Sequence, residues 1–223
     1  MPIELVIFGC EGVLVDSRAL RAEVLQAQLQ QMGVPPDRIR AVRSGLAQGL
    51  PMSVTAIEAM VGAPLPPDFA EMLEGGMQQC LARDLTVTDR LPHVLTELRV
   101  PACVVASLPE AQAQEMLQIA GLADFFPGRV FPVRDGLRAP PAPDLFLQAA
   151  QSLGFAPPQC LVFEASGVGL AAAMAAGMQV ALYVGGRHWQ GADLSAWEDV
   201  DIFHHWGDFP AELLAGSGIQ GVH

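Results

Sequence analysis

Three polar side chains each stand at or just beyond the end of a short, uncharged apolar run. Such runs are typical of strands that are buried on both faces of a parallel sheet. The carboxyl ends of parallel strands form the ligand-binding edge of an α/β protein, and carboxylates there can transfer protons or bind a divalent cation. The side chains are Glu11, Ser107 and Glu164, and the runs are Leu5–Phe8, Ala102–Ala106 and Cys160–Phe163.

The spacing of apolar residues predicts the elements that position these side chains. From about residue 89, helical patterns alternate with short apolar runs, which predicts a parallel sheet covered by helices on both faces. Residues 18–84 show helical spacing without strand-like alternation. We therefore predict an α/β fold with a three-layer, Rossmann-like core (1–16 and 89–223) and an inserted all-α segment (17–88). Further strands are expected at 129–133, 179–184 and 200–203, and helices at 18–32, 37–44, 53–61, 67–83, 90–99, 143–153, 167–176 and 210–214.

Two helix starts carry capping signals. Asp16 and Ser17 precede the helix predicted from Arg18, where a short polar side chain can accept a hydrogen bond from a free backbone N–H group. Ser107 and Glu110 have the spacing of a capping box at the start of a helix that Gly121 ends. We therefore expect Asp16 and Ser107 to cap helices.

The segment Ile3–Ser17 resembles the first motif of the haloacid dehalogenase-like (HAD) phosphohydrolases. That motif is an apolar strand followed by Asp-x-Asp-Gly-Thr/Val-Leu and often by Val-Asp-Ser. Gly12 retains the family's turn glycine, which allows a backbone conformation that a side chain would obstruct. Gly9 stands at the position of the nucleophilic aspartate, and Glu11 stands at the position of the acid/base aspartate.

Three later motifs extend the resemblance over nearly the whole chain, toward the branch that includes phosphoglycolate phosphatase and β-phosphoglucomutase. Ser107 matches the hydroxyl that binds phosphate in the family, which stands beside its interpretation as a helix cap. Residues 139–146 keep the prolines and the Asp-Leu-Phe of the third motif, with Pro140 at the position of its lysine. Arg138 lies two residues before Pro140, so it could replace the lysine only through a shifted loop.

The fourth motif is matched by residues 164–178, which retain the acidic residue Glu164 but have Ala165 in place of the following aspartate. The resemblance implies that acidic side chains here bind Mg²⁺ together with a backbone carbonyl of the first motif. Mg²⁺ prefers carboxylate oxygens in a strict octahedron. Glu164, the Glu11 carbonyl and water could therefore bind it only weakly.

The substitutions lead to two main hypotheses for function. In the family, an aspartate attacks phosphorus and forms an aspartyl-phosphate, which Gly9 cannot do. In a well-studied protease, loss of the nucleophile costs on the order of 10⁶ in turnover, or roughly 8 kcal/mol. We favour a phosphatase-like protein that has lost this step and binds a small phosphorylated ligand or a partner. The alternative is an active, Mg²⁺-dependent hydrolase of small phosphorylated metabolites that uses Glu11 and Glu164. A purely structural subunit is a third hypothesis.

Other residues have less specific interpretations. The resemblance implies that 17–88 is a cap over the cleft, where Arg43 either contacts the ligand or ends a helix in solvent. Cys10 follows Gly9, so alternation along the strand directs it into the core, and it is not expected to act as a substitute nucleophile. The histidines lack metal-ligand spacing; they are His93, His188, His204, His205 and His223.

Charge and composition exclude several classes of partner. The formal net charge is −12, and all 12 basic residues are arginine. Such a charge repels nucleic acids and anionic membrane surfaces, so neither is predicted as a partner. The four cysteines form no C-x-x-C pair and no signal peptide pattern is visible, so a reducing, cytoplasmic location is expected.

Overall fold

The computed structural model describes residues 2–48, 53–190 and 194–215. Within this part of the chain, six parallel strands form one sheet in the order β3-β2-β1-β4-β5-β6, which confirms the predicted α/β fold. The central strand β1 carries the first motif and pairs with β2 and β4, which carry the second and the fourth. The strands are β1 (Leu5–Gly9), β2 (Ala102–Ala106), β3 (Val130–Pro132), β4 (Cys160–Glu164), β5 (Gln179–Tyr183) and β6 (Asp201–Phe203).

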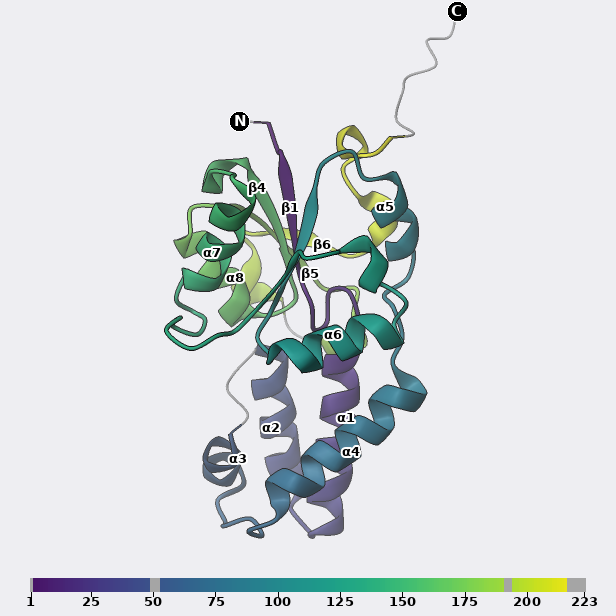
Figure 1. Cartoon of the computed structure of the whole chain (residues 1–223). Coiled ribbons are helices and arrows are strands. Elements are labelled where there is room, and N and C mark those ends of the chain that lie inside the picture. Colours follow the sequence, from purple (N-terminus) through teal and green to yellow (C-terminus); the bar gives the residue numbers. More distant parts are fainter. Residues whose placement is uncertain (1, 49–52, 191–193, 216–223) are drawn as a thin grey trace, which may run out of the picture.

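Helices cover both faces of the sheet, as predicted (Figure 1). The even-numbered side chains of β1, such as Phe8, pack with α5 (Leu91–Glu97), α6 (Glu110–Ile119) and the buried Trp206. The odd-numbered ones, such as Ile7, pack with α7 (Asp144–Leu153) and α8 (Gly167–Ala175). This alternation places residue 9 on the α7 and α8 side and Cys10 on the other.

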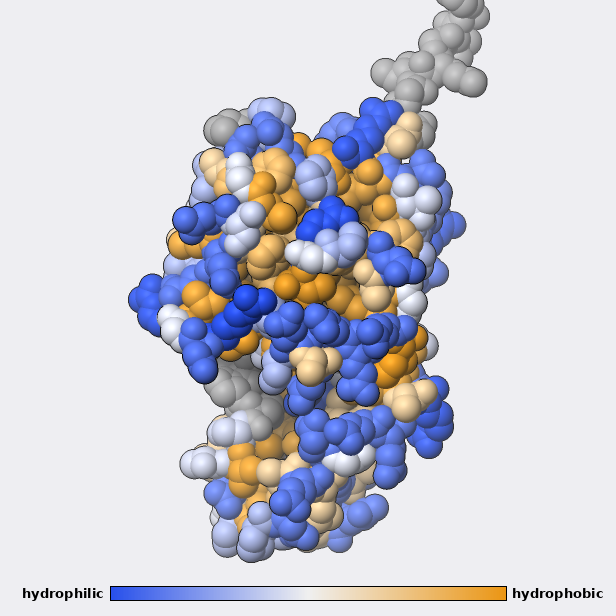
Figure 2. All heavy atoms as spheres, in the orientation of Figure 1, coloured by the Kyte–Doolittle hydropathy of each residue, from blue (hydrophilic) through white to orange (hydrophobic). Residues whose placement is uncertain are grey.

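Four helices between β1 and α5 pack around a hydrophobic cluster of their own, which includes Leu29, Ile57 and Phe69. In Figure 1 this helical block lies beyond the end of β1, and Figure 2 shows mainly hydrophilic residues over α4 and α6 on the same face. No described helix is long and apolar enough to cross a membrane. The four helices are α1 (Ser17–Gln31), α2 (Pro36–Gln48), α3 (Val54–Val61) and α4 (Phe69–Asp84).

Two predicted helices differ in the structure, one in its end and one in its type. Helix α2 does not stop before Gly45 but continues to Gln48, because the buried side chains of Val42 and Leu46 extend its apolar face across the glycine. At the C-terminal end, the helix predicted at 210–214 is a single 3₁₀ turn, Ala211–Leu213.

Both predicted caps were also wrong. Asp16 stands at the N-cap of α1 but its side chain accepts no capping hydrogen bond. Helix α6 begins at Glu110 with Pro109 as its N-cap residue, so the exposed Ser107 lies outside the helix. The capping-box interpretation of Ser107 fails because the helix starts two residues later than its spacing requires.

Candidate functional site

The carboxylate of Glu164 fills the space beside Gly9. Both residues are buried at the carboxyl ends of adjacent strands, and a Cβ atom on residue 9 would lie only 2.8 Å from Glu164 Oε1. A Cβ on Gly169, in the first turn of α8, would lie closer still to this carboxylate. The side chain of Glu164 thus folds into a space that exists because two neighbours are glycines.

Local donors hold Glu164 in this position. Its Oε2 accepts hydrogen bonds from the backbone N–H of Ala165 at 3.1 Å and from Ser166 Oγ at 3.2 Å. Burial raises the pKa of Glu164, while the nearby charge of Arg18 and these hydrogen bonds act in the opposite direction. Ser166 in turn caps α8 by accepting a hydrogen bond from Gly169 N, so the loop after β4 is ordered by its own polar groups.

Arg18 lies across the loop that follows β1. Its Nε donates a hydrogen bond to the backbone carbonyl of Glu11 at 3.0 Å. A Cβ on Gly12 would be 2.8 Å from Arg18 Cδ, and Gly12 has a φ of +80°, so this position needs glycine for two reasons. Arg21, one turn later in α1, lies 3.7 Å from Glu11 Oε1. Glu11 is therefore held by arginines at both its carbonyl and its carboxylate.

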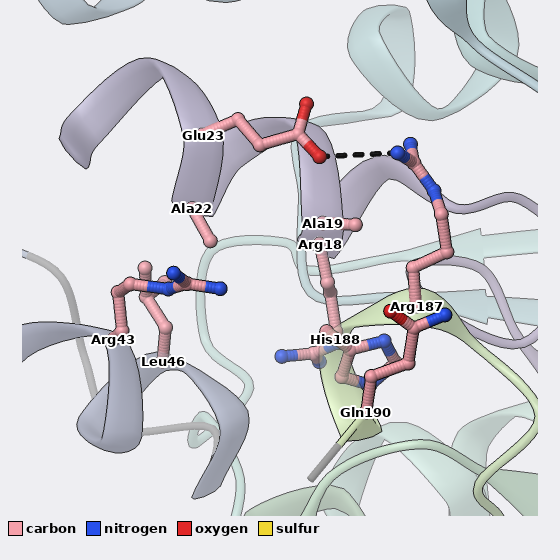
Figure 3. A pocket seen from close by; sticks show the side chains of 9 residues that line it. All are labelled: Arg18, Ala19, Ala22, Glu23, Arg43, Leu46, Arg187, His188 and Gln190. Atoms are coloured by element: carbon pink, nitrogen blue, oxygen red, sulfur yellow. Dashed lines mark hydrogen bonds and ion pairs between the residues drawn. The ribbon is translucent and has the colours of Figure 1, made fainter. Parts of the chain in front are cut away.

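A pocket of about 130 Å³ lies next to this loop, between the helical block and the sheet (Figure 3). Figure 3 shows the guanidinium groups of Arg18 and Arg43 pointing into it, the first from α1 and the second from α2. Arg43 also donates a hydrogen bond to Gln26 Oε1 at 2.8 Å. Guanidinium groups bind carboxylates and phosphates with paired hydrogen bonds, so the pocket suits a small anion. It is lined by Arg18, Ala19, Ala22, Glu23, Arg43, Leu46, Arg187, His188 and Gln190.

Arg187 joins the two halves of the molecule. It follows β5, and its backbone N–H and its Nε donate to the buried carboxylate of Asp16. Its Nη1 donates to Glu23 Oε1 at 3.0 Å, the contact drawn in Figure 3. Asp16 is thus the buried partner of a cation more than 170 positions away rather than a helix cap.

His188 lines the pocket beside Gly12. Its Nε2 lies 3.1 Å from the carbonyl oxygen of Ala165, so this nitrogen carries the proton and donates. Its Nδ1 is buried and has no hydrogen-bond partner in the described part of the chain. Burial is the main cause that lowers the pKa of His188 to about 4; the charge of Arg18 acts in the same direction, and the hydrogen bond to the Ala165 carbonyl acts against it. The ring is therefore neutral at pH 7.

The structure brings together three of the predicted site residues, Gly9, Glu11 and Glu164. Arg43 lies within α2 rather than at its end and lines the pocket. Ser107 is exposed after β2, two positions beyond the partner of Gly9 in the sheet register.

Two other predictions concern residues that do not form the site. Arg138, whose side chain is largely exposed, makes a two-pronged ion pair with Asp144 at 2.7 and 3.1 Å. This guanidinium lowers the pKa of Asp144. Cys10 is buried in the core as predicted, and burial raises the pKa of its thiol, so it is not an activated nucleophile.

Sequence reasoning missed Arg18, Arg187 and His188. The nearest local sequence feature to the last two is the glycine pair Gly185 and Gly186, which follows β5. A Cβ on Gly186 would lie 2.8 Å from the ring of His188, so this glycine makes room for the imidazole. His223 lies outside the described residues.

Comparisons with known proteins agree with this architecture. The profile of a family described as haloacid dehalogenase-like hydrolases matches residues 3–177. The 6-phosphogluconate phosphatase of Escherichia coli is 24% identical over 187 residues, which cover 83% of this chain and 85% of that protein. The phosphorylated carbohydrates phosphatase of Thermotoga maritima is 28% identical over 185 residues, covering 79% and 83%.

A solved structure shows the same fold. A HAD family hydrolase from Deinococcus radiodurans, with bound phosphate and sodium, superposes with a TM-score of 0.76 at 27% identity and covers 95% of each chain. The six-stranded parallel sheet, its flanking helices and the family match over residues 3–177 agree with one another. The chain belongs to the haloacid dehalogenase-like hydrolase family.

Proposed function

We propose that this protein binds a small phosphorylated ligand in the arginine-lined pocket and does not form an aspartyl-phosphate. The observation that carries the proposal is the carboxylate of Glu164 beside Gly9. A phosphoryl group brought to residue 9 would meet no side chain there that could attack it. The space beside residue 9 is filled by Glu164, whose Oε2 already accepts two hydrogen bonds. The pocket nearby offers positive charge.

The pocket supports binding because its cations come from separate elements. Arg18 belongs to α1 and Arg43 to α2, and both guanidinium groups point into the pocket. An anion there would be held by two helices of the inserted segment. We infer that residues 17–88 act as a cap that closes over the cleft, as the family resemblance implies. Phosphorylated sugars are the first ligands to test, because the two relatives described above are named as phosphatases of such compounds.

An active hydrolase is the second candidate, and the names of those relatives favour it. In this alternative Glu11 would transfer protons, and Glu164 with the Glu11 carbonyl would bind Mg²⁺ weakly. Glu11 is suitably placed at the end of β1, although Arg21 pairs with its carboxylate.

Calorimetric titration separates the two candidates. Inorganic phosphate and a panel of sugar phosphates are added to the wild-type protein, to Arg43→Ala and to Arg40→Ala. Arg40 is an exposed residue of the same helix outside the pocket, so its variant is the matched control. We expect Arg43→Ala to weaken binding about tenfold, the effect of losing one charged hydrogen bond. No binding of any compound would contradict the proposal.

Catalysis is tested on the same samples. With an aryl phosphate and Mg²⁺ we expect no turnover above that of buffer. Intact-mass spectrometry after incubation with a phosphoryl donor should show no added phosphoryl group. Turnover that disappears in Glu11→Gln would support the hydrolase instead.

A further inference from the structure

The Mg²⁺ site that the family resemblance implies does not fit the residues of this chain. Positions 9 and 165 supply no side-chain oxygen, since they are glycine and alanine. The remaining oxygen ligands would be the carboxylate of Glu164 and the carbonyl of Glu11. Mg²⁺ requires near-ideal octahedral coordination by oxygens and gives up its water reluctantly. One carboxylate and one backbone carbonyl leave most of the six coordination positions without a protein ligand.

Two of the three remaining oxygens already accept hydrogen bonds from the protein. The carbonyl of Glu11 accepts the hydrogen bond from Arg18 Nε. Glu164 Oε2 accepts two hydrogen bonds from the loop that follows it, and the carboxylate is packed against Gly9 and Gly169. In the described part of the chain, no group of three His, Cys, Asp or Glu side chains is arranged to hold a metal ion.

The side chain of Arg18 is packed against the loop that follows β1 and does not simply lie on the surface. Its stem passes so close to Gly12 that a Cβ there would clash with Cδ. Its positive charge is near enough to Glu164 and His188 to act on both. A divalent cation on the Glu11 carbonyl would have to displace this hydrogen bond and would be repelled by the guanidinium.

We propose that the guanidinium of Arg18 takes the place of Mg²⁺ in this cleft, so that the protein binds no divalent cation at Glu11 and Glu164. Arg18 then supplies the permanent positive charge that balances the buried carboxylate. It also lines the anion pocket, so a ligand that binds there meets a fixed cation and needs no metal. This last point alone rests on the proposed function.

Mn²⁺ titration followed by electron paramagnetic resonance tests the proposal without any assay of activity. Wild-type protein should leave the free Mn²⁺ signal unchanged at concentrations up to ~1 mM, the weak end of protein sites for divalent cations. Arg18→Met removes the charge and the hydrogen bond but keeps an apolar stem, and we expect it to bind Mn²⁺ at least about tenfold more tightly. Arg40→Met removes an exposed cation of α2 that lies outside the pocket, and it should behave as wild type.

Equal Mn²⁺ binding by wild type and Arg18→Met would overturn the proposal. If Arg18→Met does not fold, the melting temperature of the wild type decides. The same value in Mg²⁺ and in chelator supports the proposal, and a rise with Mg²⁺ overturns it, because a bound cation stabilises the folded state. Phosphate titration in chelator is read separately. Failure of phosphate to bind would contradict the proposed function and leave the Mn²⁺ result standing.

Discussion

Glu164 Oε1 lies 2.8 Å from the point where a side chain on Gly9 would begin. The first and fourth motifs therefore share one space, which either a side chain at residue 9 or the carboxylate of Glu164 can fill. Because Gly169 lies against the same carboxylate, the glycine at position 9 is part of a packing arrangement and not an isolated substitution.

Substitution of Gly9 should destabilise the protein. We expect Gly9→Ala to lower the free energy of unfolding by about 1–3 kcal/mol, because the new methyl group overpacks a buried site. In Glu164→Ala the clash is absent, so the two substitutions should show a coupling of about 1 kcal/mol in a double-mutant cycle. Urea unfolding of the four proteins measures both quantities.

Gly75→Ala is the control for the loss of a glycine. Gly75 lies within α4, and a Cβ there would meet nothing within 4 Å. Alanine favours helix more than glycine, so this variant should be more stable by roughly 0.5–1 kcal/mol. If Gly9→Ala were as stable as the wild type, Glu164 would not occupy the position seen in the structure.

The ion pair between Asp16 and Arg187 should contribute more to stability than the pair that Arg187 makes with Glu23. Asp16 is 6% exposed, whereas Glu23 lies on the surface. Arg187 itself is almost half exposed, so solvent screening reduces the cost of losing its buried partner. We expect Asp16→Asn to lower the free energy of unfolding by about 1–2 kcal/mol and Glu23→Gln by less than about 0.5 kcal/mol. Chemical unfolding compares them, and equal effects would contradict the burial argument.

The sheet could be predicted because strands buried on both faces of a parallel sheet have uninterrupted apolar sequences. Leu5–Phe8 and Ala102–Ala106 have no exposed face, so no polar residue interrupts them. The helices of the inserted segment followed from apolar spacing in the same way. The end of α2 was missed since a glycine signals a stop only when the apolar face also ends, and here it continues to Leu46.

The sequence identified site residues only where these residues lie at or just after the end of a strand. Glu11 lies two residues after the end of β1 and Glu164 is the last residue of β4, so topology alone brings them together. Asp16 and Arg187 are 171 positions apart, and no local pattern relates them. Arg18 faces the Glu11 carbonyl because Gly12 has no side chain, a relationship that spacing does not reveal.

Thr88 connects the first motif to the C-terminal aromatic cluster. Its Oγ1 donates to the carbonyl of Val13 at 2.7 Å and accepts from Trp206 Nε1 at 2.8 Å, and all these groups are buried. Thr88→Val keeps the shape but leaves the indole N–H and the carbonyl without partners. We expect a loss of about 2–3 kcal/mol in the free energy of unfolding. Thr96→Val, at an exposed position of α5, should change it by less than about 0.5 kcal/mol. A neutral Thr88→Val would show that water replaces the hydroxyl.

His188 should make stability depend on pH below neutrality. Burial lowers the pKa of the folded imidazole to about 4 from its ordinary 6.5. Between these values the unfolded chain binds a proton at this site and the folded chain does not. The stability that the neutral ring of His188 contributes is therefore fully present above pH 6.5. It is lost as the pH falls toward 4, which lowers the free energy of unfolding by up to about 3 kcal/mol.

Free energies of unfolding measured between pH 4 and pH 8 test whether stability falls on acidification. His188→Gln does not titrate, and its amide can still donate toward Ala165, so its stability should fall less steeply on acidification than that of the wild type. His93→Gln, at an exposed position of α5, should follow the wild-type curve. If His188→Gln and wild type had the same slope, the imidazole would be protonated in the folded protein. A cation would then lie beside Arg18, where the unpartnered Nδ1 has no acceptor to stabilise it.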